Sequence, residues 1–134
     1  MEYKESTDKK INVRQMNDLR ESVGWMERNE RTWEEILSKS SFVYSLWDGE
    51  KLIGMGRFLE DSMMCIFYDV AVRKEYQGIG LGKKIMKKMI SEARDRGCLS
   101  IRLFVDEQNA ESLILFYEKL GFGLIETGMK YKLI

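Results

Sequence analysis

The N-terminal part of the chain contains two short helical patterns of hydrophobic residues. The hydrophobic positions of the first are spaced as on one helix face: Val13, Met16, Leu19 and Val23. They predict a helix over 12–23 that ends at Gly24, since glycine commonly follows a helix C-terminus. Thr32, followed three residues later by Glu35, has the form of a capping box and predicts a second helix over 33–39.

The pattern then changes to that of strands. Hydrophobic runs at 42–47, 51–59 and 63–72 are separated by short polar turns, the first of which contains an Asp-Gly pair. Three strands connected by short turns predict an antiparallel meander. Gly54 and Gly56 lie inside the second strand, where they indicate either a face open to a ligand or close packing against a helix.

The second half of the chain alternates helices and strands. An amphipathic helix is predicted over 80–96, with lysines on its polar face, and a strand over 100–105 that follows this crossover and is therefore parallel to its predecessor. A further helix over 109–120 and two short strands, Phe122–Glu126 and Met129–Leu133, complete the order. The pattern predicts one mixed α+β (α/β) domain over 1–134.

Composition narrows the class of function. With 22 basic and 22 acidic residues, the formal net charge is zero, which argues against a general nucleic-acid or membrane-surface binder. No run of about 18 hydrophobic residues offers a membrane span, and the N-terminus lacks the hydrophobic core of a signal peptide. We therefore expect a cytoplasmic protein.

The rare residue types limit the chemistry. The chain has no histidine, which excludes Ser–His–Asp and Cys–His mechanisms and leaves a carboxylate, a lysine, a tyrosine or water as proton acceptor. Cys65 and Cys98 lie in hydrophobic patterns and form no metal-ligand cluster. We expect two reduced thiols, with a redox role as the less favoured alternative, and no metal site.

The stretch from Tyr68 to Gly82 is the strongest functional signal. A hydrophobic strand leads through a charged loop into a glycine cluster and then into a basic helix. Glycines allow the backbone to approach a ligand closely, and the unpaired N–H groups at a helix N-terminus attract an anion. These features predict a phosphate-binding loop, although the lysines could equally form only a solvated basic face.

Two familiar phosphate loops do not fit this stretch. A Walker loop needs Gly-Lys followed by Ser or Thr, but Gly82-Lys83 is followed by Lys84, and Gln77 stands at the position of the earlier glycine. A dinucleotide-binding loop would need glycine in place of Lys83. Nucleotide hydrolysis and nicotinamide binding are therefore disfavoured.

Two blocks resemble the GNAT superfamily of N-acetyltransferases. The segment Gln77–Gly82 is similar to its Gln/Arg-x-x-Gly-x-Gly/Ala signature, and Phe116–Phe122 resembles its C-terminal motif. The order of predicted elements also agrees with the GNAT fold. The resemblance implies a mixed, mostly antiparallel sheet of about six or seven strands with about four helices, splayed between the fourth and fifth strands.

The resemblance implies acetyl-coenzyme A as the acetyl donor. Backbone N–H groups of the loop would hold its pyrophosphate, with these residues at the coenzyme: Gln77, Gly78, Ile79, Gly80, Leu81, Gly82 and Lys83. The pantetheine would pair like an added strand with Val70, Ala71 and Val72. Asn109 resembles the family asparagine at the pantetheine, although Tyr117 follows it by eight residues, one more than is usual in the family. Lys74 stands where family loops often carry proline.

Two residues are candidates for catalysis. Tyr117 matches the family tyrosine that can protonate the departing thiolate, and packing beside Phe116 is its alternative role. The amine must be neutral to attack the thioester directly through a tetrahedral intermediate, so something must accept its proton. Asp69, directly or through water, could do so, and pairing with Arg57 or Arg73 is the equally weighted alternative. A backbone N–H near Val70 would stabilise the intermediate.

The acceptor site would draw on the first helices, the early strands and the end of the chain. Its expected hydrophobic residues are Trp25, Tyr44, Phe58 and Met129, although Trp25, together with Trp33, is expected more strongly to close the core. We expect a small aromatic or aliphatic primary amine as acceptor, as in the arylalkylamine or serotonin N-acetyltransferases that the chain resembles. A protein N-terminus or lysine is the alternative acceptor, and a non-catalytic acyl-coenzyme A sensor is the alternative outside enzymes. A homodimer is also expected, because many proteins of this fold form one.

Overall fold

The structure is a computed structural model that describes residues 2–125 and 128–134. It divides into two compact units, residues 1–104 and residues 105–134. The first unit contains the sheet and three of the helices, and the second contains a fourth helix and the C-terminal segment.

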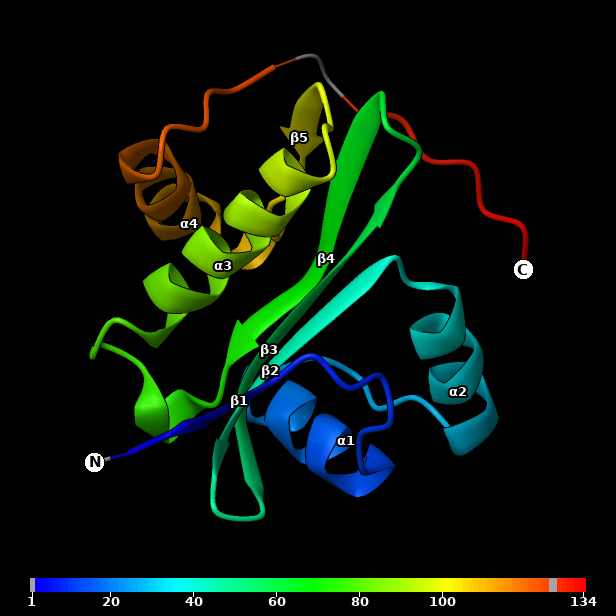
Figure 1. Cartoon of the computed structure of the whole chain (residues 1–134), viewed down its shortest axis with the longest axis vertical. Coiled ribbons are helices and arrows are strands. Elements are labelled where there is room, and N and C mark those ends of the chain that lie inside the picture. Colours follow the sequence, from blue (N-terminus) through cyan, green and yellow to red (C-terminus); the bar gives the residue numbers. More distant parts are fainter. Residues whose placement is uncertain (1, 126–127) are drawn as a thin grey trace. The chain divides into compact units, whose positions relative to one another are not determined.

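The first unit is built on one sheet of five strands in the order β1-β2-β3-β4-β5 (Figure 1). The strands are β1 (Lys4–Ser6), β2 (Phe42–Asp48), β3 (Lys51–Glu60), β4 (Met64–Val72) and β5 (Ser100–Arg102). The first four pair antiparallel, and β5 pairs parallel to β4. The predicted meander and the predicted parallel strand are both confirmed.

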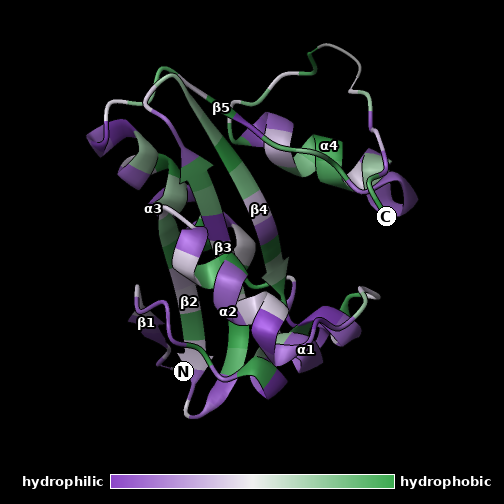
Figure 2. Ribbon diagram, turned by 90° about the vertical axis from the view of Figure 1, so that its right-hand side faces the viewer, coloured by the Kyte–Doolittle hydropathy of each residue, from purple (hydrophilic) through white to green (hydrophobic). Residues whose placement is uncertain are grey.

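Helices cover both faces of this sheet. The helices α1 (Val13–Ser22) and α2 (Glu30–Lys39) lie on one face, and α3 (Leu81–Asp95) lies on the other (Figure 1). In Figure 2 the strands β2 and β3 are green with hydrophobic residues along much of their length, because helices cover both of their faces. The core under α1 and α2 contains Met16, Leu19, Trp33, Leu37, Val43, Leu52, Met55 and Ala71. Trp33 is thus a core residue, as expected.

Close packing explains the two glycines of β3. A Cβ atom added to Gly54 would lie 2.8 Å from Cδ1 of Ile85, and one added to Gly56 would collide with Sδ of Met89. Both of these partners project from α3. Of the two alternatives for these glycines, the structure supports packing against a helix.

The ladder between β4 and β5 is short. It joins only Met64–Ile66 to Ser100–Arg102, and β4 continues for six further residues beyond it, from Phe67 to Val72. No strand among the described residues of the first unit pairs with this edge of the continuing strand. The predicted splaying of the fourth and fifth strands is therefore present.

Two details of the first unit differ from the sequence prediction. The strand β1 was not expected, because its three residues are polar and it pairs only at the sheet edge. The helix α2 begins at Glu30, where the side chain of Asn29 accepts a hydrogen bond from the N–H of Thr32 at 2.8 Å. Asn29 therefore takes the capping role that we assigned to Thr32.

The second unit contains the turn η2 (Glu107–Asn109) and the helix α4 (Ala110–Lys119). The described residues after it, 120–125 and 128–134, form no strand. The predicted strands Phe122–Glu126, which extends into undescribed residues, and Met129–Leu133 are therefore not formed in the described part of the chain. This lowers the strand number to five, whereas the mixed α+β class holds.

Among the described residues, no helix has the length and hydrophobicity needed to cross a membrane. Residues 2–125 and 128–134 also contain no cluster of three or more histidine, cysteine, aspartate or glutamate side chains that could hold a metal ion.

Candidate active site

The glycine loop opens directly into α3. Gly78 and Gly80 have φ angles of 82° and 90°, a conformation that glycine adopts without steric cost. Gly80 is the N-cap of α3, has no side-chain cap, and accepts the first intrahelical bond from the N–H of Lys84. The N–H groups of the first helical turn therefore have no intrahelical acceptor and suit an anion.

Hydrogen bonds fix the segment between β4 and this loop. The Tyr76 hydroxyl donates to Asp48 at 2.6 Å, and the N–H of Lys74 donates to Oγ of Ser22 at 3.1 Å. The side-chain amide of Gln77 donates to the carbonyl of Val72 at 2.9 Å. The loop is thus anchored to the β2–β3 hairpin, to α1 and to β4, which supplies the stiffness that a proline at position 74 would give.

A bulge interrupts β4 just before the predicted pantetheine segment. Tyr68 is paired with Arg57 and Ala71 with Met55, so that Asp69 and Val70 together lie opposite the single residue Gly56. Asp69 has a φ of 54°, which is uncommon for a residue other than glycine. A bulge leaves backbone groups outside the ladder, which fits the predicted N–H donor near Val70.

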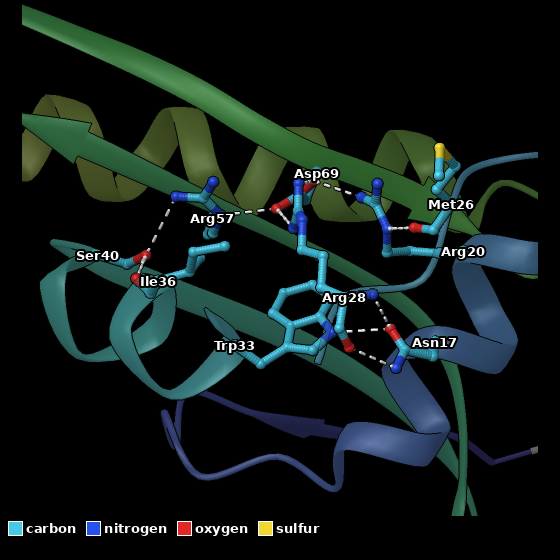
Figure 3. A network of polar contacts seen from close by, with 9 residues as sticks. All are labelled: Asn17, Arg20, Met26, Arg28, Trp33, Ile36, Ser40, Arg57 and Asp69. Carbon is cyan, nitrogen blue, oxygen red and sulfur yellow. Dashed lines mark hydrogen bonds and ion pairs between the residues drawn. The ribbon is translucent and has the colours of Figure 1, made fainter. Parts of the chain in front are cut away.

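The side chain of Asp69 is held by three arginines. Its carboxylate accepts hydrogen bonds from Nη1 of Arg20 at 2.9 Å, from Nη1 of Arg28 at 2.8 Å and from Nε of Arg57 at 2.8 Å (Figure 3). The side chain of Asp69 is only 8% exposed. Of the two pairing partners considered from the sequence, Arg57 is the one found, whereas Arg73 donates to the carbonyl of Leu52 instead.

This network opposes the predicted role of Asp69 as proton acceptor. Burial alone would raise the pKa of Asp69, but hydrogen bonds and charges from Arg28 and Arg57 outweigh it and lower the pKa below its usual range. A carboxylate with a lowered pKa is a weaker base than an ordinary one. Asp69 therefore fits the alternative role, a structural ion-pair partner.

Sequence reasoning missed Arg20 and Arg28. They lie 49 and 41 residues away from Asp69 in the chain, and only the folding of α1 and the α1–α2 link onto the sheet brings them to it. Local spacing contains no signal for such a contact. The bulge that turns Asp69 toward this face is likewise a property of the paired strands.

The predicted acceptor residues of the first unit do not form one site, because Trp25 lies on the α1 side of the sheet whereas Tyr44 and Phe58 lie on the α3 side. Trp25 is half-buried against the core under α1, and the guanidinium of Arg20 lies 5.1 Å from the centre of its ring. Tyr44 and Phe58 are fully buried. Tyr44 lies opposite Gly56 in the ladder, on the face that α3 covers, and its hydroxyl donates to Glu5. We correct the prediction for both: they are core residues, because hydrophobicity in a strand does not distinguish its two faces.

The second unit holds the remaining predicted residues. Tyr117 lies edge-to-face with Phe116 and Phe122, at centroid distances of 5.2 and 5.8 Å. Desolvation raises the pKa of its hydroxyl, which therefore stays protonated at neutral pH. Asn109 is exposed and precedes α4 without a side-chain cap bond, and Met129 is 99% exposed.

Comparison with known proteins decides the family. The model of the acetyltransferase (GNAT) family matches residues 11–122, which include most of both units. The chain belongs to the GNAT family. The short parallel ladder, the bulge and the glycine loop are thus parts of an N-acetyltransferase. The family match does not distinguish the arylalkylamine subgroup that the sequence resembles.

Relatives of this GNAT protein cover nearly its whole length. An uncharacterized N-acetyltransferase, ycf52, of Pyropia yezoensis is 32% identical over 130 residues, which cover 93% of this chain and 72% of that protein. Histone acetyltransferase TAP1 of Glycine max is 33% identical over 132 residues, which cover 90% of this chain and 55% of that protein.

Among solved structures, a protein of unknown function from meticillin-resistant Staphylococcus aureus, described as a probable acetyltransferase, has a similar fold. The TM-score is 0.82 at 26% identity, and the match covers 98% of this chain and 99% of that one. The fold class predicted from the sequence is confirmed.

Proposed function

We propose that the protein transfers the acetyl group of acetyl-coenzyme A to a small primary amine, aromatic or aliphatic. One observation carries the proposal: the free edge of β4 runs through the Asp69–Val70 bulge and the anchored segment into an uncapped helix N-terminus. An extended thiol arm and a diphosphate need this sequence of features, an open strand edge followed by N–H donors.

The residues of the loop fit such a coenzyme. A Cβ atom built on Gly78 or Gly80 would have no neighbour within 4 Å, so the space beside the backbone is open. Backbone donors from Gln77 to Lys83 would hold the diphosphate, and Val70 to Val72 would pair with the pantetheine. When bound, the coenzyme would supply an acetyl thioester. The neutral amine would first form a bond to its carbonyl carbon, and the carbon–sulfur bond would break afterwards to release the thiolate.

The reaction needs two proton transfers, one to the departing thiolate and one from the amine. The departing thiolate needs a proton, and Tyr117 would donate it, since its hydroxyl is protonated at neutral pH, although desolvation raises its pKa and so makes it a weaker acid than an ordinary tyrosine. The amine must lose a proton, and Asp69 is a poor acceptor because its pKa is lowered. We assign that step to water, one of the acceptors that the sequence left open.

Coenzyme binding is tested by comparing two glycines at opposite ends of α3. Gly80 has a φ of 90° at the N-terminus and Gly97 a φ of 78° just after the C-terminus, and neither has a neighbour at its Cβ position. Replacement of either by alanine strains the backbone by about 1 kcal/mol. We expect Gly80→Ala to weaken acetyl-coenzyme A binding at least tenfold in calorimetry, and Gly97→Ala to lower only the melting temperature.

Wild-type protein should gain roughly 2 to 4 kcal/mol of stability at acetyl-coenzyme A concentrations of 100 to 1,000 times the dissociation constant. Absence of any thermal shift would refute the coenzyme assignment, and equal binding by both alanine variants would refute the site.

Activity is tested by thiol release from acetyl-coenzyme A with a panel of amines and lysine peptides. Tyr117→Phe should lower kcat by about a hundredfold, the usual size of one acid catalyst's contribution, and leave coenzyme binding unchanged. Turnover of peptides alone would favour a protein acceptor, to which the name of the Glycine max relative points. Coenzyme binding without turnover of any acceptor would identify a sensor.

A further inference from the structure

The three arginines around Asp69 carry more charge than that carboxylate neutralises. We call Arg20, Arg28 and Arg57 the arginine triad. Three guanidinium cations surround one carboxylate, and no second carboxylate among the described residues lies within ion-pair distance of any of them. The cluster therefore has two positive charges in excess.

The triad is not sealed in the core. The Arg28 side chain is 24% exposed and that of Arg20 is 12% exposed. Nη2 of Arg20 and Nη2 of Arg57 have no hydrogen-bond acceptor among the described residues. Among the described residues, every side-chain nitrogen or oxygen that is fully buried has a hydrogen-bond partner, so a side-chain nitrogen without a partner is not fully buried. These two nitrogens are therefore accessible to solvent and free to donate.

Aromatic rings hold the guanidinium planes in place. The Cζ atom of Arg28 lies 4.7 Å from the centre of the Trp33 ring, and that of Arg57 lies 4.6 Å from the centre of the Tyr68 ring. Arg20 lies over Trp25 in the same manner. A guanidinium held by a ring and a carboxylate keeps its remaining donors in a fixed direction, which favours bidentate binding of a carboxylate or phosphate.

The position of the triad relates it to the proposed reaction. Asp69, which the triad holds, immediately precedes the Val70–Val72 segment assigned to the pantetheine. Arg28 lies on the α1–α2 link, and Nε of Arg20 fixes the carbonyl of Met26 on that same link (Figure 3). A ligand bound to the triad would thus lie beside the α1–α2 link, close to the strand where the acetyl group is expected.

We propose that the arginine triad binds an anionic group, a carboxylate or a phosphate, of the amine acceptor. This inference rests on the proposed function. It narrows the acceptor to a small molecule that carries both an amine and an anion, such as an amino acid or an amino alcohol phosphate. A lysine-rich peptide is disfavoured, because the excess positive charge of the triad repels it.

The test compares amines that differ only in the anionic group. Tyrosine and tyramine form the carboxylate pair, and O-phosphoethanolamine and ethanolamine form the phosphate pair. We expect the wild-type kcat/KM to be at least tenfold higher for the anionic member of one pair. The pair that shows the preference identifies the anion.

Arg20→Gln removes one of the two free donors, Nη2 of Arg20, and should raise the KM for the anionic amine at least tenfold, with kcat within twofold. The KM for the neutral amine should stay unchanged, which a merely structural role would not produce. Arg31→Gln is the matched control, since Arg31 is an exposed residue of α2 that pairs only with Glu35 among the described residues. It should change neither KM.

Inorganic phosphate provides a measurement that needs no variant. At saturating acetyl-coenzyme A it should compete with the anionic amine in the wild-type protein and leave the KM for the neutral amine unchanged. Equal kcat/KM for both members of each pair, or equal loss for both in Arg20→Gln, overturns the inference while the proposed function stands. Turnover of no amine, despite coenzyme binding, would instead refute the proposed function.

Discussion

Replacement of Asp69 by asparagine separates a structural role for this residue from a catalytic one. The substitution keeps the shape of the side chain and one oxygen acceptor but removes the negative charge. Three guanidinium groups then converge without a counter-charge, at donor distances that are now 2.8 to 2.9 Å. Repulsion among them should destabilise the fold.

The magnitude follows from the burial of the cluster. Removal of one partner from a buried ion pair costs about 3 to 5 kcal/mol. The arginine side chains are 10% to 24% exposed, so water screens part of the repulsion, and asparagine keeps an acceptor. We therefore expect the lower end, a loss of about 3 kcal/mol. For a chain of 134 residues this lowers the melting temperature by roughly 12 °C.

The assay is thermal and urea unfolding of wild type and Asp69→Asn at neutral pH. Asp95→Asn is the control, since Asp95 is exposed and has no ion pair among the described residues, and it should shift melting by less than about 2 °C. In an Asp69→Asn background, Arg28→Gln should restore part of the loss because it removes one of the opposed charges. A loss below about 1 kcal/mol in Asp69→Asn would refute this reasoning.

Acid adds an independent check. The pKa of Asp69 is lower in the folded protein than in the unfolded chain. Its contribution to stability is thus fully present above the unfolded pKa of about 4 and is lost as the pH falls through the folded pKa. The difference between wild type and Asp69→Asn should shrink below pH 4. Abolished kcat at unchanged melting temperature would instead indicate a catalytic base.

Three smaller perturbations test the packing, the capping and the thiol. Gly56→Ala should cost about 1 to 2 kcal/mol in urea unfolding, because the new methyl group meets Met89, and a more stable variant would contradict this. Asn29→Ala should cost about 1 kcal/mol whereas Thr32→Ala costs less, and the reverse order would restore the capping box. Burial raises the pKa of the Cys65 thiol to about 12, so the stability that its protonated form contributes should be lost as the pH rises from about 8.5 toward 12. Rapid alkylation of Cys65 in the native protein at pH 8 would argue against this.

Elements with a strong periodic pattern could be predicted from the sequence. The α3 helix was expected over 80–96 and is found at Leu81–Asp95, and α4 was expected over 109–120 and is found at Ala110–Lys119. In both, hydrophobic residues on one face and a terminal glycine define the element locally. The glycine loop was identifiable for the same reason, since its residues are contiguous.

Features that depend on distant pairing could not be predicted. The strand β1 has no hydrophobic alternation of its own and exists because it pairs with β2. The two C-terminal segments have strand-like composition but no paired neighbour among the described residues. The environment of Asp69 forms only where α1, the α1–α2 link and β3 meet β4, so the sequence allowed a free carboxylate and a paired one equally.

The glycines of β3 also connect core packing to ligand affinity. They allow α3 to lie close to the sheet, and Met89, which meets Gly56, lies eight residues after Leu81 in the same helix. At 1.5 Å per residue, this contact is about 12 Å along the rigid helix from its N-terminus. A larger side chain at position 56 would push the helix outward and carry its N-terminal donors with it. Core substitutions far from the proposed coenzyme site would thus alter ligand affinity, because they displace the N-terminus of α3.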